Sequence, residues 1–260
     1  MKEIESHNPE IHAGLTGEVR DFWSRHVNAE RIFGKTVSTY ERGADQYFAD
    51  LESQRYRSHR HLLPWIHSMT AGRTVLEIGC GIGLDSFAMA RHGLQVTAVD
   101  LTQVAAHTAD QRFRKNAMSG SFTVADAGHL PFPDNCYDYV YSFGVLHHAA
   151  DTGLTIREAL RVLKPGGEAR IMLYHRRSLN EFMHRLLRVP FEEKRALCPV
   201  VRRYTIAEIY DLFKDFSNVR VHIDHLYGEG YGLLYRLTPR WLYTLLSRRI
   251  GWHIMISAFK

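Results

Sequence analysis

The pattern of apolar and polar positions changes its period repeatedly through the middle of this 260-residue chain. Short apolar runs, typical of strands buried on both faces, alternate with segments whose apolar residues recur every three to four positions, typical of amphipathic helices. The expected strands are 74–79, 95–100, 121–126, 137–144 and 168–174. The expected helices between them are 84–93, 101–117 and 152–163. This alternation predicts an α/β fold, a Rossmann-like and mostly parallel sheet with helices on both faces.

The two flanks of this core add further elements. In front of it, residues 1–70 are expected to form a helical cap, with a helix over about 42–60 that could close as a lid over a ligand pocket. Packing of the same helix on the sheet edge is an equally open interpretation. Behind the core region 71–177, residues 178–260 are expected to add a helical insertion and two more strands. These last strands are expected at 219–227 and 252–259, one of them antiparallel, which gives a seven-stranded sheet.

Composition and charge argue against several classes of protein. No apolar run approaches the ~20 residues that cross a bilayer, and the polar start of the chain is unlike a signal peptide. The three cysteines, Cys80, Cys136 and Cys198, form no CxxC pair, so neither a zinc knuckle nor a disulfide framework is indicated. A cytoplasmic location is therefore expected. The net charge of +5 comes from scattered basic residues, which argues against a nucleic-acid partner, while a homodimer is left open.

The turn after the first expected strand carries a cluster of glycines. The run VLEIGCGIGLD (75–85) places Gly79, Gly81 and Gly83 between a strand and a helix. Glycines at such a turn let the backbone approach a ligand closely and present the N–H groups of the helix end. A dinucleotide fingerprint would need a glycine where Leu84 stands, so the GxGxG pattern weighs against NAD.

Two aspartates follow at the ends of the next strands. Asp100 ends the second strand, and Asp126 comes directly after the third. A carboxylate in the first position can accept hydrogen bonds from both ribose hydroxyls, and one in the second can accept a hydrogen bond from an adenine amine. Because the carboxyl ends of parallel strands meet at one edge of a sheet, the glycines and both aspartates together predict a site for an adenosine-containing cofactor.

These residues carry a resemblance to a known family. Residues 73–174 resemble the class I S-adenosylmethionine (SAM)-dependent methyltransferases, and more narrowly their quinone-biosynthesis-type (methyltransferase type 11) small-molecule group. The matching runs are VLEIGCGIG, AVD, ADAGHLPFPDNCYDYVYSFGVLHH and EALRVLKPGG. The resemblance implies a Rossmann-like fold, SAM as cofactor and S-adenosylhomocysteine (SAH) as product.

The resemblance also implies where the cofactor binds. Glu77 and the glycines would hold the methionine part of SAM, Asp100 the ribose, and Leu101 and Asp126 the adenine. The backbone at Phe143 would meet the ammonium or sulfonium. With neighbouring positions and two tyrosines of the expected lid helix added, the predicted cofactor site consists of Glu77, Gly79, Cys80, Gly81, Gly83, Asp100, Leu101, Asp126, Ala127, Phe143, Tyr47 and Tyr56.

Histidines at the ligand edge of the sheet are the candidate catalytic bases. His147 and His148 follow the fourth strand and His175 follows the fifth, so each could take the proton of an acceptor hydroxyl. His147 is preferred, because packing against the next helix explains His148 as well as catalysis does. No HxH or HxxxH pattern with a nearby carboxylate completes a metal site, so no metal is expected.

The other histidines are expected to have no functional role. His59, His61 and His67 belong to a basic stretch and are expected to face solvent. His222 and His225 alternate within an expected strand, where packing or exposure explains them.

The whole pattern predicts transfer of a methyl group from SAM to an oxygen of a small molecule, in preference to nitrogen or carbon. The insertion after the fifth strand would wall an acceptor pocket suited to an amphiphilic or acidic molecule, through Phe182, Leu186, Phe191, Arg202 and Arg203. An RNA or protein methyltransferase is one alternative, although no NPPY-type motif follows the fourth strand. A SAM-binding regulator without turnover is an alternative from another class.

Overall fold

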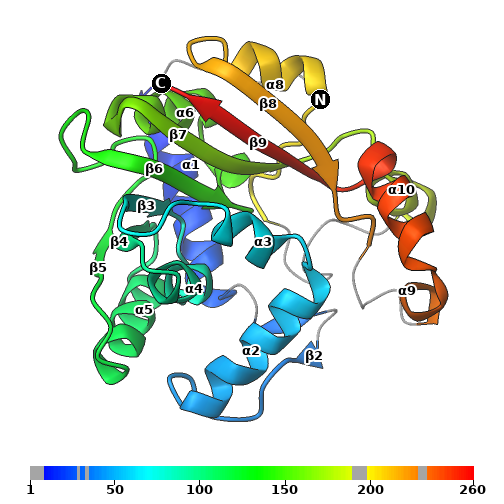
Figure 1. The fold of residues 1–260 in the computed structure, drawn as a ribbon, viewed down its shortest axis with the longest axis horizontal. Helices are drawn as coiled ribbons and strands as arrows, with labels where there is room; N and C mark the ends of the chain where they lie inside the picture. The colour runs from blue at the N-terminus through cyan, green and yellow to red at the C-terminus, as the bar shows by residue number, and fades with distance from the viewer. Residues whose placement is uncertain (1–8, 28–29, 33–34, 189–197, 228–232) are drawn as a thin grey trace.

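The computed structural model describes residues 9–27, 30–32, 35–188, 198–227 and 233–260. Its centre is a seven-stranded sheet in the order β5-β4-β3-β6-β7-β9-β8 (Figure 1). Within this sheet β9 runs antiparallel to both of its neighbours, and the remaining strands run parallel to one another. The predicted seven-stranded, mostly parallel sheet is confirmed. Its strands are β3 (Thr74–Ile78), β4 (Gln95–Asp100), β5 (Ser121–Val124), β6 (Tyr137–Phe143), β7 (Leu163–Tyr174), β8 (Ser217–Asp224) and β9 (His253–Phe259).

The helices of the described ranges surround this sheet, and a small two-stranded sheet lies outside it. Two strands, β1 (Arg31–Ile32) and β2 (Lys35–Thr36), form the small sheet. The helices are α1 (Pro9–Arg25), α2 (Asp45–Ser58), α3 (Leu62–His67), α4 (Leu84–Arg91), α5 (Gln103–Lys115), α6 (Thr152–Val162), α7 (Leu179–Leu187), α8 (Ile206–Leu212), α9 (Leu233–Leu237), α10 (Arg240–Ile250) and the short 3-10 turn η1 (Leu146–His148). None of the described helices is long and apolar enough to cross a membrane.

Alternating side chains of the strands build a core on each face of the sheet. In β3, Leu76 and Ile78 join a cluster formed with α6 and α8, whereas Val75 joins a second cluster formed with α3, α4 and α5. These strand residues are at most 1% exposed, as expected for a parallel sheet that is covered on both faces. The result is a three-layer arrangement in which helices enclose the sheet, as the sequence pattern predicts.

The order of the strands reverses at the centre of the sheet. From β3 the chain winds outward through β4 to β5, then returns to place β6 on the other side of β3. At such a reversal the connections leave the sheet in opposite directions, which opens a crevice beyond the carboxyl ends of the strands. The crevice therefore lies where the glycine-rich turn after β3, the end of β4 and the end of β6 meet.

Among the later elements, a local cap fixes the start of α8, whereas the bounds of β7 and β8 differ from the expected ones by a few residues. The capping box of α8 forms as expected, since the Thr205 hydroxyl accepts the backbone N–H of Glu208 and the Glu208 carboxylate reaches back to Thr205. The strand β7 begins at Leu163, earlier than the expected 168, because Leu163 pairs with Tyr137 before a shift of register in β6. The strand β8 ends at Asp224, earlier than the expected 227.

Candidate active site

A cavity opens at the crevice beyond the carboxyl ends of β3, β4 and β6. Most of the predicted cofactor residues meet in its wall, although they come from separate segments of the chain. Those that line it are Glu77, Gly79, Cys80, Gly81, Asp100, Leu101, Asp126, Ala127 and Phe143. Gly83, Tyr47 and Tyr56 are not among the lining residues.

The glycines of the turn after β3 are required for two different reasons. Gly79, Gly81 and Gly83 have φ angles of +77°, +53° and +75°. In this left-handed region the backbone of a residue with a side chain is strained. A Cβ at Gly79 would lie 2.4 Å from the methyl groups of Val145, and one at Gly83 would lie 2.8 Å from Ala109 Cβ. A Cβ at Gly81 would meet nothing within 4 Å. Gly83 therefore serves the packing of α4 on α5, while Gly79 and Gly81 shape the cavity wall.

Asp100 stands at the end of β4 with its carboxylate already partly satisfied. Gly81 N–H donates to Oδ2, and the Thr102 backbone N–H and hydroxyl both donate to Oδ1, each at 2.9 Å. Burial raises the pKa of Asp100 above its usual value, which these hydrogen bonds only partly oppose. A carboxylate has about four acceptor positions and three are occupied here, so it retains capacity for one further donor such as a ribose hydroxyl.

Asp126 lies after β5 and is less enclosed than Asp100. Its Oδ1 accepts the backbone N–H of Gly128 at 2.9 Å, which fixes the carboxylate at the cavity wall. Its side chain remains 34% exposed, and Ala127 lines the cavity beside it. A carboxylate held in this way can accept a hydrogen bond from an exocyclic amine.

A buried group of charges at the start of α4 forms the floor of the cavity. Arg55 Nε donates to Asp85 Oδ1 at 2.7 Å, a second guanidinium nitrogen pairs with Oδ2, and the Tyr141 hydroxyl donates to Oδ2 at 2.9 Å. Glu77 accepts the Ser86 hydroxyl, and burial together with the nearby Asp85 holds the pKa of Glu77 well above its usual value. No sequence pattern indicates a role for Arg55, whereas Asp85 is the last residue of the glycine-rich run 75–85.

Comparison with known proteins identifies this arrangement. Residues 76–171 match the sequence family described as "Methyltransferase domain", and this segment contains the glycine turn and both aspartates. Residues 76–171 form a methyltransferase domain. The predicted resemblance to class I SAM-dependent methyltransferases is confirmed, and SAM is the cofactor that the domain implies.

Individual relatives agree with this assignment. A stretch of the chain is 37% identical over 102 residues to a 27-O-demethylrifamycin SV methyltransferase of Amycolatopsis mediterranei, which covers 38% of each chain. The chain is also 35% identical over 150 residues to a 2-methyl-6-phytyl-1,4-hydroquinone methyltransferase of Synechocystis, which covers 56% of this chain and 47% of the relative. The chain thus spans less than half the length of both of these curated relatives.

A solved structure extends the likeness of the fold beyond the methyltransferase domain. A SAM-dependent methyltransferase of Thermotoga maritima, described as a possible histamine N-methyltransferase, superposes with a TM-score of 0.63. The two chains are 18% identical, and the superposition covers 93% of this chain and 99% of the other. At this identity the likeness shows the shared fold only.

The N-terminal helix α1 covers the cavity, a role that was predicted for the later helix α2. Thr16, Val19 and Trp23 of α1 line the cavity, whereas Arg55 is its lining residue from α2. These α1 residues are spaced at i, i+3 and i+7, the spacing of one face of a helix. That periodicity is the signal that could have revealed α1.

The two tyrosines predicted to contact SAM instead hold α2 in place. The Tyr47 hydroxyl donates to Glu30 at 2.5 Å, and its ring packs with Ile82 and Leu84. The Tyr56 hydroxyl lies 3.1 Å from the Leu84 carbonyl oxygen and from Asp85. The prediction of cofactor contacts is therefore replaced by a packing role, because both hydroxyls are used by the protein. Tyr40, also considered for the lid, is 55% exposed.

Of the three candidate bases, the structure places His148, and not His147 or His175, in the cavity wall. His148 lines the cavity, and its Nδ1 donates to the Val200 carbonyl oxygen at 2.7 Å. His147, preferred from the sequence, is fully buried against Tyr174 with a ring distance of 3.8 Å and does not line the cavity. Burial and the adjacent His148 lower the pKa of His147 well below its usual value. His175 is likewise outside the lining, and its Nδ1 donates to the Gly251 carbonyl oxygen at 3.0 Å.

The predicted acceptor wall does not gather at the cavity. Phe182 and Leu186 of α7 are 59% and 62% exposed, and Phe191 lies outside the described residues. The Arg202 guanidinium donates to the carbonyl oxygens of Ala149 and Ala150, and Arg203 lies 3.3 Å from Glu181. Arg202 therefore supports the segment after η1, whose Ala149 and Ala150 line the cavity, rather than facing an acid itself.

Two histidines expected to face solvent turn inward. His59 and His61 follow α2 and lie against Phe143, at ring distances of 5.8 Å and 6.0 Å. Burial lowers the pKa of His61 to about 4 and that of His59 well below its usual value. The prediction from the basic stretch is wrong because the chain turns between α2 and α3 and places both rings in the interior of the protein. His67 is exposed, as expected.

Proposed function

We propose that this chain transfers a methyl group from SAM to an oxygen of a small-molecule acceptor. The observation that carries the proposal is the convergence of the glycine turn, Asp100, Asp126 and His148 on one cavity. A cytoplasmic location belongs to the same proposal, and the three cysteines, which form no disulfide, support it.

Each residue of the cavity has a role that follows from its geometry. SAM supplies an electrophilic methyl group on sulfur, so the protein's task is mainly to align it with the acceptor. Asp100 accepts a hydrogen bond from a ribose hydroxyl, and Asp126 accepts one from the adenine amine. Val19 and Trp23 of α1 keep water out of the cavity. Because this work consists of positioning, the rigid turn after β3 is as important as any charged group.

His148 is the residue proposed to remove the acceptor proton. Since its Nδ1–H donates to the Val200 carbonyl oxygen, the lone pair of the neutral ring lies on Nε2. The acceptor oxygen forms a bond to the methyl carbon as the bond from that carbon to sulfur breaks, and the hydroxyl proton passes to His148 Nε2. The sulfur keeps the electron pair of the broken bond, and SAH is the product.

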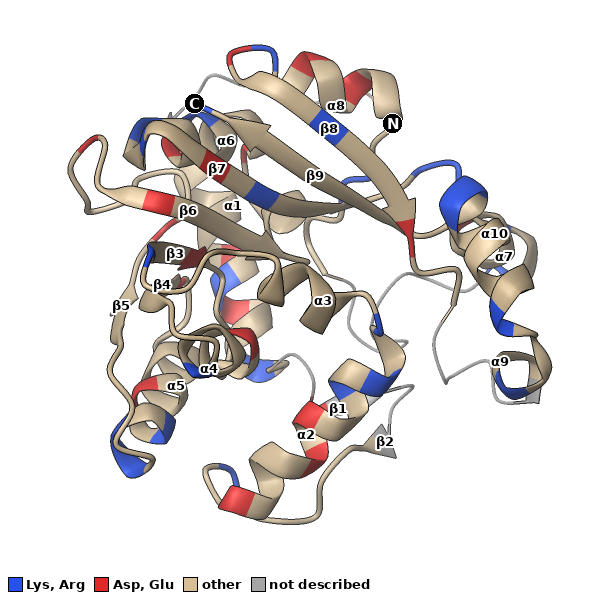
Figure 2. Cartoon of the chain, in the orientation of Figure 1, with Lys and Arg blue, Asp and Glu red and all other residues tan. Residues whose placement is uncertain are grey.

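The distribution of charge favours a small acceptor over a nucleic acid. Figure 2 shows Lys and Arg on several separate elements, among them α2, α5 and α10, with Asp and Glu between them. Recognition of a polyanion would favour one continuous basic surface. Acceptor methylation that falls steeply with added salt would instead favour the alternative of an RNA substrate.

Calorimetric titration with SAM and SAH tests the cofactor part of the proposal. We expect the wild-type protein to bind both ligands and Asp100→Ala to lose at least about tenfold in affinity, because ribose loses its acceptor. Burial raises the pKa of Asp100 in the protein without ligand, and the hydroxyl donor of a bound cofactor lowers it again. The cofactor therefore binds the ionised carboxylate more tightly. Affinity should be highest above the pKa of Asp100 in the ligand-free protein and should fall as the pH drops through that pKa.

The same titration in Asp100→Asn should lose most of this pH dependence, since the amide does not titrate. Asp110→Asn, a change on the partly exposed side chain of α5, is the matched control. Equal affinity of Asp100→Ala and the wild type would contradict the assigned ribose site. Binding of SAH without methylation of any screened acceptor would favour the regulator alternative.

A further inference from the structure

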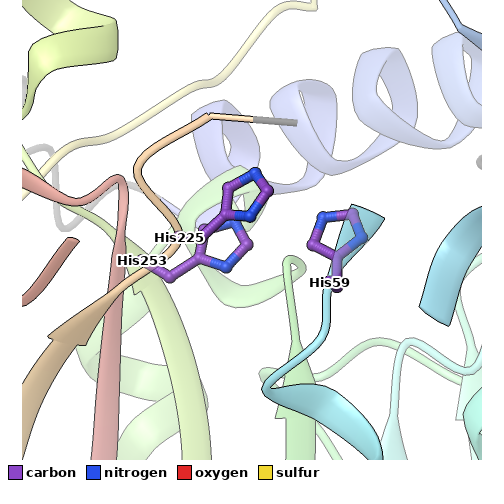
Figure 3. A group of neighbouring side chains, drawn as sticks. All are labelled: His59, His225 and His253. Carbon is purple, nitrogen blue, oxygen red and sulfur yellow. The ribbon is translucent and has the colours of Figure 1, made fainter. Parts of the chain in front are cut away.

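Four histidines from distant parts of the chain meet beside the SAM cavity. His59 and His61 follow α2, His225 follows β8, and His253 begins β9. The ring centroids of His59, His225 and His253 lie 4.4 to 5.4 Å apart. One ring nitrogen from each of these three lies within 4.8 Å of the other two. Figure 3 shows the three side chains reaching from separate segments toward a common space.

The hydrogen bonds around the cluster leave one ring nitrogen of each of the three histidines uncommitted. His59 Nδ1 donates to the Arg55 carbonyl oxygen at 3.1 Å, so the lone pair of its neutral ring lies on Nε2. His253 Nδ1 lies 3.2 Å from His61 Nε2, which commits that nitrogen and leaves Nε2. His225 is 8% exposed, and its buried Nδ1 has no hydrogen-bond partner in the described part of the chain. A buried polar atom without a partner is uncommon and requires a reason.

The cluster is buried, and the charge beside it is paired. His225 and His253 are 8% and 3% exposed. Neutral imidazole, the form of histidine that a buried site favours, is also the form that binds metals. The nearby positive charge of Arg55 is balanced by its ion pair with Asp85.

We propose that His59, His225 and His253 bind one divalent transition-metal ion. Imidazole suits zinc, copper, nickel and iron, whereas magnesium and calcium prefer oxygen ligands. At a metal–nitrogen distance of about 2.1 Å, tetrahedral ligand nitrogens lie roughly 3.4 Å apart, so the rings approach one another by about an ångström on binding. The rings now lie within 16° of parallel, so binding also turns them about χ2 until their lone pairs converge.

His61 and Asp224 hold one ligand in the correct orientation. His61 Nδ1 lies 3.9 Å from Asp224 Oδ1, and His61 Nε2 lies 3.2 Å from His253 Nδ1. At 3.9 Å the Asp224 carboxylate makes no hydrogen bond to His61, but its charge favours a proton on His61 Nδ1. His61 Nε2 then accepts the Nδ1 proton of His253, which leaves the His253 Nε2 lone pair for the ion. Outer partners of this kind commonly fix the tautomer and the ring plane of a metal-binding histidine.

The site lies one aromatic ring away from the cofactor. Phe143 lines the SAM cavity, and its ring lies 5.2 Å from His253 and 5.8 Å from His59. Three protein ligands leave one tetrahedral position open, which is the arrangement of catalytic rather than structural zinc sites. That position would take water or an acceptor oxygen, whose pKa the ion would lower. This last role rests on the proposed function, whereas metal binding itself does not.

Metal binding can be measured without any acceptor. The full chain, stripped with a chelator and dialysed, is titrated with Co²⁺ while visible absorption is recorded, and with Zn²⁺ in a calorimeter. We expect one equivalent to bind to the wild type and to His67→Ala, in which an exposed histidine of α3 is removed. His225→Ala and His253→Ala should weaken binding by at least about 100-fold, and His61→Ala by about 10–100-fold.

His225→Gln keeps most of the side-chain volume and serves as a second variant should His225→Ala fail to fold. SAH affinity and thermal unfolding are measured on the same samples. No stoichiometric binding by the folded wild type, or binding that is unchanged in both His225→Gln and His253→Ala, would overturn the proposal. If SAH binds in those samples, only the metal site fails; if the metal binds and SAH does not, only the proposed function fails.

Discussion

At the scale of single residues, His148 is the group whose removal should separate chemistry from cofactor binding. We expect His148→Ala to lower methylation of a screened hydroxyl acceptor by about 10²–10⁴-fold, the usual contribution of a positioned general base. SAH affinity should change little, because Asp100 and the glycine turn remain. Steady-state turnover and calorimetry measure the two effects, with the exposed His107→Ala as control. Full turnover in His148→Ala would mean that alignment alone drives the reaction.

Two glycines of one turn offer a matched comparison of packing and backbone strain. Gly79→Ala should lose about 1–2 kcal/mol of unfolding free energy through its φ of +77°, and a further ~1–3 kcal/mol because its Cβ would lie 2.4 Å from Val145. Gly81→Ala, whose Cβ would meet nothing within 4 Å, should lose only the strain. Urea unfolding measures both.

Adding Val145→Ala to Gly79→Ala should restore most of the packing loss, because the two methyl groups that the new Cβ meets are gone. Equal losses in Gly79→Ala and Gly81→Ala would show that backbone strain alone explains these glycines.

At the scale of elements, the helix α1 makes the cavity more than an open crevice. Trp23 lines the cavity and its ring meets His148 at 5.1 Å, so Trp23→Ala should weaken SAH binding by about tenfold or more, equivalent to roughly 1.4 kcal/mol of lost apolar contact. Ile11, 48% exposed on the same helix, provides the control Ile11→Ala. Calorimetry compares both with the wild type, and equal effects of the two variants would argue against α1 as a cover.

The sequence predicts best those elements whose bounds are set by their own residues rather than by distant contacts. The expected strand 95–100 and the observed β4 have the same bounds, because an apolar run between polar turns defines a buried strand locally. The helix α1 was missed as a separate element, although Val19 and Trp23 carry its periodicity. Its function depends on where it docks, and that is set by the cavity it covers rather than by its own sequence.

At the scale of the whole molecule, the site combines contacts that no local pattern predicts. Gly79, Asp100 and Asp126 could be predicted to meet because parallel strands place their carboxyl ends together. His59, His225 and His253 come from a helix end, a strand end and a strand start, and spacing rules for metal sites detect none of them. The exchange of roles between His147 and His148 has the same origin, since the 3-10 turn η1 decides which ring faces the cavity.

The ion pair between Arg55 and Asp85 joins the N-terminal part of the chain to the methyltransferase domain. The Arg55 side chain is 15% exposed and that of Asp85 only 3%, so each charge depends on the other for its burial. Arg55→Met should lower the unfolding free energy by about 3–5 kcal/mol, because it leaves Asp85 beside Glu77 without a cation. Asp85→Asn should have a similar cost, since it leaves the guanidinium unpaired.

The double variant decides whether this coupling exists. Since it removes both buried charges, Arg55→Met with Asp85→Asn should cost clearly less than the sum of the single changes, with a coupling of about 1–3 kcal/mol in urea unfolding. The exposed Arg57→Met on the same helix should stay within about 0.5 kcal/mol of wild type. Strictly additive losses would mean that the two charges do not couple, so that α2 is held to the domain by its apolar contacts and tyrosines rather than by this ion pair.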